Sequence, residues 1–145
     1  IMSLKDGSKK MSKSELSDLS RINLTDNKDQ IINKIKKAKT DPMPMPINSG
    51  ELNERLEAKN LLGIYASLTN TTLEKSLENF SGKNFSEFKE SLSEILVNKI
   101  EPISIEIKKL LADQIYLDQI LLEGVEKANL IASKKIQKIK EIVGF

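Results

Sequence analysis

Apolar residues recur three or four positions apart along most of this 145-residue chain, whereas residues 1 to 24 show no sustained period. That spacing places apolar side chains on one face of a helix. An alternation typical of a β-strand is found at most over residues 1 to 4. The pattern therefore predicts an all-α fold, a helical bundle preceded by a polar N-terminal loop.

Capping and breaking residues divide the helical part of the chain. The first helix is expected to begin with a cap at Thr25 or Asp26 and to stop before a Pro-rich segment. Thr71, with Glu74 three residues later, fits the capping box of a short helix ending near residue 80. Other helices are expected over residues 56–68, from 85 with an end or a kink at Pro102, and from about Asp113 onward. The last of them carries a long apolar stripe made of Leu117, Ile120, Leu121, Gly124, Ala128, Ile131, Ala132, Ile139 and Val143.

Residues 41 to 50 contain three of the four prolines of the chain and end in Asn48-Ser49-Gly50. Because proline fixes its own φ angle, this Pro-rich segment is expected to be an extended linker. It is the best candidate for an internal boundary within residues 25 to 145.

The composition narrows the possible chemistry. Lysine and arginine total 23 against 21 aspartate and glutamate, so the net charge is only +2 and a site for a polyanion must be local. The chain has no cysteine and no histidine, hence no thiolate nucleophile, no imidazole base and none of the usual zinc ligands. Much of enzyme chemistry is thereby excluded, and no metal site is expected.

No apolar run approaches the roughly 20 residues that a membrane-spanning helix needs. The N-terminus also lacks the apolar segment of a signal peptide. We therefore expect a cytoplasmic protein with no membrane partner.

The most informative motif is Lys10-Met11-Ser12-Lys13-Ser14, which reads KMSKS and follows a further lysine. Two lysines separated by two residues can converge on one polyanion when they lie in a turn. The serines between and after them offer hydroxyl and backbone donors that phosphate oxygens accept. A solvated basic loop is the alternative that charge alone leaves open.

KMSKS in a polar loop directly ahead of a helical domain resembles the second signature of class I aminoacyl-tRNA synthetases. Further blocks resemble the bacterial tryptophanyl-tRNA synthetase family: MSL at 2–4, SRINL at 20–24, KKAKTDP at 36–42, NLLGIY at 60–65, GKNFSEFK at 82–89 and IVGF at 142–145. Tyrosyl-tRNA synthetases also carry a KMSKS loop, but the helical blocks are more similar to the tryptophan family. The family usually continues with Asp-Pro after the motif, whereas this chain has Glu15-Leu16, so the turn just beyond the loop is not predicted by the resemblance.

The resemblance implies roles for the loop residues. Lys10 and Lys13 would contact the phosphates of ATP, with Mg²⁺ screening them, and stabilise the departing pyrophosphate as tryptophanyl-adenylate forms. Met11, Ser12 and Ser14 would shape the loop and supply donors to the same phosphates. Ile1 matches a family position whose backbone lies near the adenine. By the same resemblance, residues 1–24 close the catalytic domain and residues 25–145 form an α-helical tRNA-binding domain.

The other signature of class I synthetases, HIGH, requires a histidine, which this chain does not have. No Gly-rich phosphate loop replaces it. The nucleotide-binding half, which would also bind tryptophan, is expected to lie upstream of Ile1, and the chain alone is expected to be inactive. A homodimer is implied for the full-length enzyme. The alternative is a free-standing helical module that binds RNA or protein without catalysis, against which the start at Ile1 argues.

Two groups of lysines could contact the phosphate backbone of a tRNA, or could simply be solvated helix surface. They are Lys34, Lys36, Lys37 and Lys39 in the first helix, and Lys127, Lys134, Lys135 and Lys138 in the last. The aromatic residues could stack on unpaired bases, but at helical spacing most of them are expected to pack in the core. They are Tyr65, Tyr116, Phe80, Phe85, Phe88 and Phe145.

Overall fold

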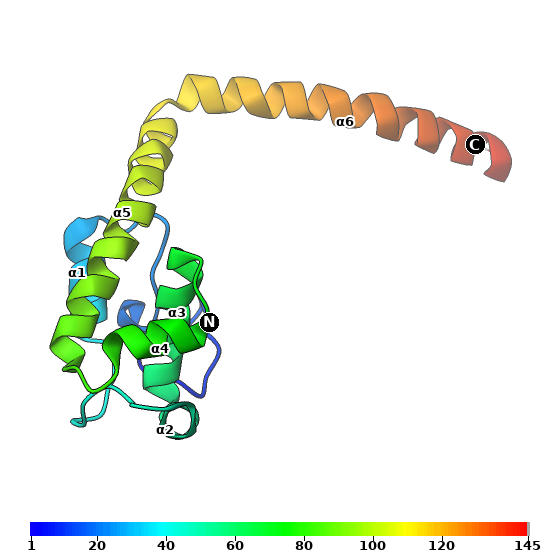
Figure 1. Cartoon of the computed structure of the whole chain (residues 1–145). Helices are drawn as coiled ribbons and strands as arrows, with labels where there is room; N and C mark the ends of the chain where they lie inside the picture. Colours follow the sequence, from blue (N-terminus) through cyan, green and yellow to red (C-terminus); the bar gives the residue numbers. More distant parts are fainter. Residues whose placement is uncertain (145) are drawn as a thin grey trace. The chain divides into compact units, whose positions relative to one another are not determined.

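The computed structural model describes residues 1–144, and all α-helices of this part of the chain lie after residue 27 (Figure 1). Its elements are η1 (Asp18–Ser20), α1 (Lys28–Lys36), α2 (Ser49–Glu54), α3 (Leu56–Thr69), α4 (Leu73–Phe80), α5 (Phe85–Ala112) and α6 (Gln114–Val143). No β-strand occurs in the described residues, where an isolated antiparallel bridge joins Met2 to Lys10. The all-α prediction is confirmed. Phe145, in the predicted IVGF block, lies outside the described residues.

Local polar residues set the helix starts. The cap of α1 is Asn27, so the prediction of Thr25 or Asp26 was wrong. The Asn27 side chain accepts a hydrogen bond from the N–H of Gln30, and the Gln30 side chain accepts one from the N–H of Asn27, both at 2.9 Å. This reciprocal pair satisfies two N–H groups that the first helical turn leaves free. Asp26 is buried and pairs with a lysine instead.

Polar side chains also cap the starts of later helices. The side chain of Thr72, one residue after the predicted Thr71, caps α4 by accepting from the N–H of Lys75. The predicted start of the last helix near Asp113 is confirmed, and the Asp113 side chain caps α6 by accepting from the N–H of Tyr116. Pro102 lies inside α5 and does not end it.

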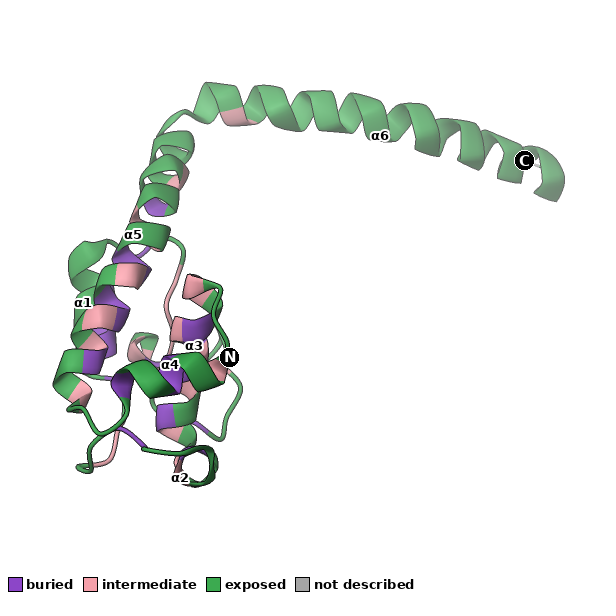
Figure 2. Cartoon of the chain, viewed as in Figure 1, coloured by how far each residue is buried: buried purple, intermediate pink, exposed green. Residues whose placement is uncertain are grey.

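The chain divides into two compact units, Ile1–Ile105 and Glu106–Phe145. The first unit has a hydrophobic core to which α1, α3, α4 and α5 contribute buried side chains, shown in purple in Figure 2. Phe88 is completely buried in it. The rings of Phe80 and Phe88 lie 4.9 Å apart, and that of Tyr65 lies 4.9 Å from Phe80, all in edge-on or tilted contact. These aromatic residues are core residues, as expected.

The Pro-rich segment is packed into the first unit. Met45 and Pro46 are buried, and the backbone N–H of Met45 donates to the carbonyl of Lys83 at 2.8 Å. Arg55 also holds the segment, with two hydrogen bonds to the carboxylate of Asp41. Such a two-pronged contact fixes the segment in position.

In the second unit α6 is exposed at every residue except Leu117, which is intermediate (Figure 2). Its apolar stripe is present, but none of the described α6 residues is buried; Leu121 is 65% and Ile131 72% exposed. The stripe therefore does not contribute to a buried core of the described chain. Among residues 1–144, no helix combines the length and apolarity that crossing a membrane requires.

Candidate functional site

The KMSKS loop begins in a short paired segment. The N–H of Ser3 donates to the carbonyl of Lys9 at 2.8 Å, and the N–H of Met11 donates to the carbonyl of Ile1 at 3.3 Å. Residues 1–3 and 9–11 thus lie side by side, joined by the bridge of Met2 to Lys10. The pairing brings Ile1 next to the start of the motif.

A side chain from α3 holds the outer edge of this pair. Asn60 accepts from the N–H of Met2 at 2.8 Å and donates to the carbonyl of Met2 at 2.9 Å. An amide side chain can match a peptide group in this way because it offers one acceptor and two donors. Next along the chain, Leu4 is buried in the core and its N–H donates to the carbonyl of Ser20. The loop is therefore anchored to the helical unit.

The turn from Asp6 to Ser8 connects the two paired segments. The Asp6 carboxylate accepts from the hydroxyl of Ser8 at 2.6 Å and from its N–H at 3.0 Å. These bonds from Ser8 lower the pKa of Asp6 to about 2. Gly7 is buried against the backbone of α3: a Cβ added to it would lie 2.6 Å from the carbonyl carbon of Leu56. Only glycine fits this close approach.

The tip of the loop is open to solvent. Lys10 and Lys13 are exposed, and neither forms an ion pair with a carboxylate of residues 1–144. The hydroxyls of Ser12 and Ser14 lie 2.9 Å apart, and Ser12 Oγ accepts from the N–H of Ser14. Met11 is partly buried and packs against the core. The motif thus presents two ammonium groups outward on a backbone fixed behind them.

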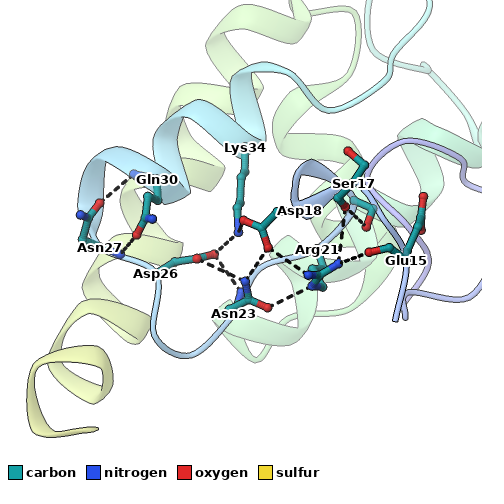
Figure 3. Close-up of polar contacts among 10 residues, drawn as sticks. Glu15, Ser17, Asp18, Arg21, Asn23, Asp26, Asn27, Gln30 and Lys34 are labelled. Atoms are coloured by element: carbon teal, nitrogen blue, oxygen red, sulfur yellow. Dashed lines mark hydrogen bonds and ion pairs between the residues drawn. The ribbon is translucent and has the colours of Figure 1, made fainter. Parts of the chain in front are cut away.

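The exit of the loop is held by an arginine (Figure 3). Arg21 Nη1 donates to the carbonyl of Glu15 at 2.9 Å and reaches that of Ser17 at 3.5 Å. Its Nε donates to Asn23, and its Nη2 pairs with Asp18 at 3.1 Å. The turn after the motif, where the chain departs from the family's Asp-Pro, is therefore fixed by a side-chain contact.

Lys34 of α1 completes this polar cluster (Figure 3). Its Nζ lies 2.7 Å from carboxylate oxygens of both Asp18 and Asp26, and its side chain is only 3% exposed. The hydrogen bond from Lys34, with a further one from Asn23, lowers the pKa of Asp18. A buried ammonium is stable only with such partners.

These contacts change which lysines of the first group could contact a polyanion. Lys34 is buried between carboxylates and cannot face a polyanion, so its placement in that group was wrong. Lys39 is exposed but lies 2.8 Å from Glu57, whereas Lys36 and Lys37 are exposed. All four lysines of the second group, on α6, are exposed.

Arg21, Asn60 and Lys34 were not singled out as parts of the site by the sequence. Arg21 lies three residues from Asp18 and seven from Ser14, a spacing that hints at a local contact but does not specify a carbonyl partner. Asn60 lies far from the loop in sequence and carries no local signal. Within residues 1–144, no group of three or more carboxylates gathers as a metal ion would require.

Comparisons with known proteins agree on one group of enzymes. Residues 1–100 match the family model described as tRNA synthetases class I (W and Y). Over all its 145 residues the chain is 50% identical to a tryptophan–tRNA ligase of Agrobacterium fabrum and 48% identical to one of Rickettsia felis. It covers 41% and 43% of those proteins, so it spans about two fifths of their length.

A solved structure shows the same relationship in three dimensions. The crystal structure of tryptophanyl-tRNA synthetase from Mycoplasma pneumoniae superposes with a TM-score of 0.70 at 27% identity. The match covers all of this chain and 43% of that one.

Proposed function

Since the chain belongs to the family of class I tRNA synthetases of the W and Y type, we propose that it is the C-terminal part of a tryptophan–tRNA ligase. The full-length enzyme would form tryptophanyl-adenylate from tryptophan and ATP and transfer the tryptophanyl group to tRNA(Trp). The observation that carries the proposal is the KMSKS loop, whose two lysines are exposed and free of carboxylate partners within residues 1–144. The identity of about 50% to named tryptophan–tRNA ligases supports the choice of amino acid.

The chemistry proposed for the loop is electrostatic. Lys10 and Lys13 would bind the phosphates of ATP and stabilise the charge that develops on pyrophosphate as it leaves. Ser12, Ser14 and the backbone of Met11 would donate to the same oxygens, and the backbone of Ile1 would lie near the adenine. Magnesium would arrive with ATP as part of the substrate. No residue of this chain needs to exchange a proton or form a covalent bond in this step.

The remaining assignments follow from the same proposal. Residues 1–24 would close the catalytic domain, and residues 25–145 would form the helical domain that binds tRNA. Tryptophan would bind to the part of the enzyme that this chain lacks, so the chain alone would not activate it. The full-length enzyme would act as a homodimer in the cytoplasm.

Substitution of Lys13 in the full-length enzyme tests the proposal. Lys13→Ala should slow tryptophan-dependent exchange of pyrophosphate into ATP by about 10²-fold or more, as loss of a transition-state contact does. The affinity for tryptophan should change little, because Lys13 would act on the phosphates. Pre-steady-state formation of the adenylate and equilibrium binding of tryptophan measure the two effects separately.

Lys37→Ala is the matched control, since Lys37 is an exposed lysine of the same chain outside the loop. It should leave exchange unchanged. Equal losses of adenylate formation and tryptophan binding in Lys13→Ala would argue against a transition-state role. Absence of tryptophan-dependent exchange in the unsubstituted enzyme would overturn the proposed function.

A further inference from the structure

The guanidinium of Arg21 joins the end of the KMSKS loop to a fixed polar cluster. One nitrogen donates to the carbonyl of Glu15, the residue directly after the motif, at 2.9 Å. A second pairs with the Asp18 carboxylate at 3.1 Å, and Nε donates to Asn23 at 3.2 Å. The side chain is 17% exposed, so most of it is shielded from water. A planar guanidinium with three such partners has little freedom to move.

The partners of Arg21 are themselves fixed from α1. Asp18 accepts from Lys34 at 2.7 Å, and Lys34 is anchored a second time by the buried Asp26. Asn23 is tied to the same cluster, because its N–H donates to Asp26 at 2.8 Å. A continuous chain of charged hydrogen bonds therefore runs from a buried lysine of a core helix to the backbone carbonyl of Glu15.

The two ends of the loop are held in different ways. Its start is fixed by backbone pairing with residues 1–3 and by Asn60. Its return past Ser14 has no such pairing: the N–H of Glu15 reaches the carbonyl of Ser12 only at 3.5 Å. Arg21 therefore supplies the short contact on this side, two residues after Lys13.

We propose that Arg21 is a positioning residue for Lys13: by holding the Glu15 carbonyl, it sets where the Lys13 ammonium lies in the transition state of adenylate formation. This role rests on the proposed function of the loop. A charge stabilises a transition state only if it is already in place, and a displacement of about 1 Å can cost on the order of 10²-fold in rate. Lysine cannot replace Arg21, because a single ammonium cannot hold a carbonyl, Asp18 and Asn23 in the same plane.

The test is made in the full-length enzyme with Arg21→Lys and Arg21→Gln. Both should lower kcat of tryptophan-dependent ATP–pyrophosphate exchange by about 10-fold or more and leave KM for tryptophan within about twofold. The matched control is Arg55→Lys. Arg55 is similarly shielded from water, being 19% exposed, and its guanidinium donates to Asp41 and to the carbonyl of Pro44. It touches no residue of the loop in these contacts and should lower the melting temperature without lowering kcat.

A double-substitution cycle separates positioning from general damage. If Arg21 acts through Lys13, Arg21→Lys should have almost no effect on kcat in an enzyme that already carries Lys13→Ala. An equal fold-loss in both backgrounds would overturn the proposal, as would a kcat unchanged by Arg21→Lys or a kcat lost equally in Arg55→Lys. If the unsubstituted enzyme has no tryptophan-dependent exchange, the proposed function fails first, and the role of Arg21 fails with it.

Discussion

The ammonium nitrogen of Lys34 lies 2.7 Å from a carboxylate oxygen of Asp26, and the two side chains are 3% and 4% exposed. The pair joins α1 to the segment that leads out of the KMSKS loop. Asp18 lies at the same distance from Lys34 on the other side, so one buried cation holds two carboxylates. Removing the cation would leave Asp26 buried without a counter-charge.

Lys34→Met should therefore be strongly destabilising. The methionine fills much the same space, but the Asp26 carboxylate loses the partner that offsets its desolvation. Breaking a buried ion pair from one side typically costs about 3–5 kcal/mol in the free energy of unfolding. Urea denaturation followed by circular dichroism measures this on the 145-residue chain.

Lys37→Met is the control for this measurement, because Lys37 is exposed three residues further along. Its effect should stay within about 0.5 kcal/mol, as is usual for surface substitutions. If both variants unfold at the same urea concentration, the buried pair does not stabilise the fold.

The second prediction concerns Gly7, which is buried and leaves no room for a Cβ beside the first turn of α3. In Gly7→Ala the new methyl group would lie 2.6 Å from Leu56 C and 2.7 Å from Glu57 N, both of them backbone atoms. The backbone of the loop or of α3 must move, and such overpacking costs about 1–3 kcal/mol. The free energy of unfolding should fall by that amount.

Gly63→Ala is the matched control in the same region, because nothing lies within 4 Å of a Cβ at that position. Gly63 lies inside α3, where alanine is the better helix former by up to about 1 kcal/mol. The control should gain stability while Gly7→Ala loses it. A gain in both variants would show that the loop does not pack against α3 at Gly7.

Most of the helices could be predicted because their signals are local, although α2 (Ser49–Glu54) was not. The start of α6 at Asp113 depends on a single side chain that caps a neighbouring N–H group, and the period of apolar residues marks α3 and α5. The KMSKS motif is equally local, being five consecutive residues. For such features the chain carries the relevant partners within a few positions.

The rest depends on contacts between distant residues. Lys34 stands in a lysine-rich stretch and looks like helix surface, and only the fold reveals that Asp18 and Asp26 enclose it. Asn60 pairs with Met2 across 58 positions, with no pattern to mark it. The α6 stripe has the period of a buried helix face, but the period alone does not supply a surface to cover it.

The exposure of α6 leads to the last prediction: removal of residues 113–145 should leave the stability of the remaining chain almost unchanged. None of the described residues removed is buried, whereas the core of the first unit is built from residues before 105. The free energy of unfolding should therefore change by less than about 1 kcal/mol, because no large apolar area is uncovered.

The chain supplies its own probe for this experiment. It has no tryptophan and two tyrosines, one of which, Tyr116, lies in α6. Truncation after Ala112 leaves Tyr65, whose ring packs against Phe80 and Phe88, as the single tyrosine reporting on the core. The comparison is the 145-residue chain with Tyr116→Phe, so that Tyr65 fluorescence is followed in both proteins. Equal midpoints in urea are expected; a loss of several kcal/mol in the truncated chain would mean that α6 stabilises residues 1–112.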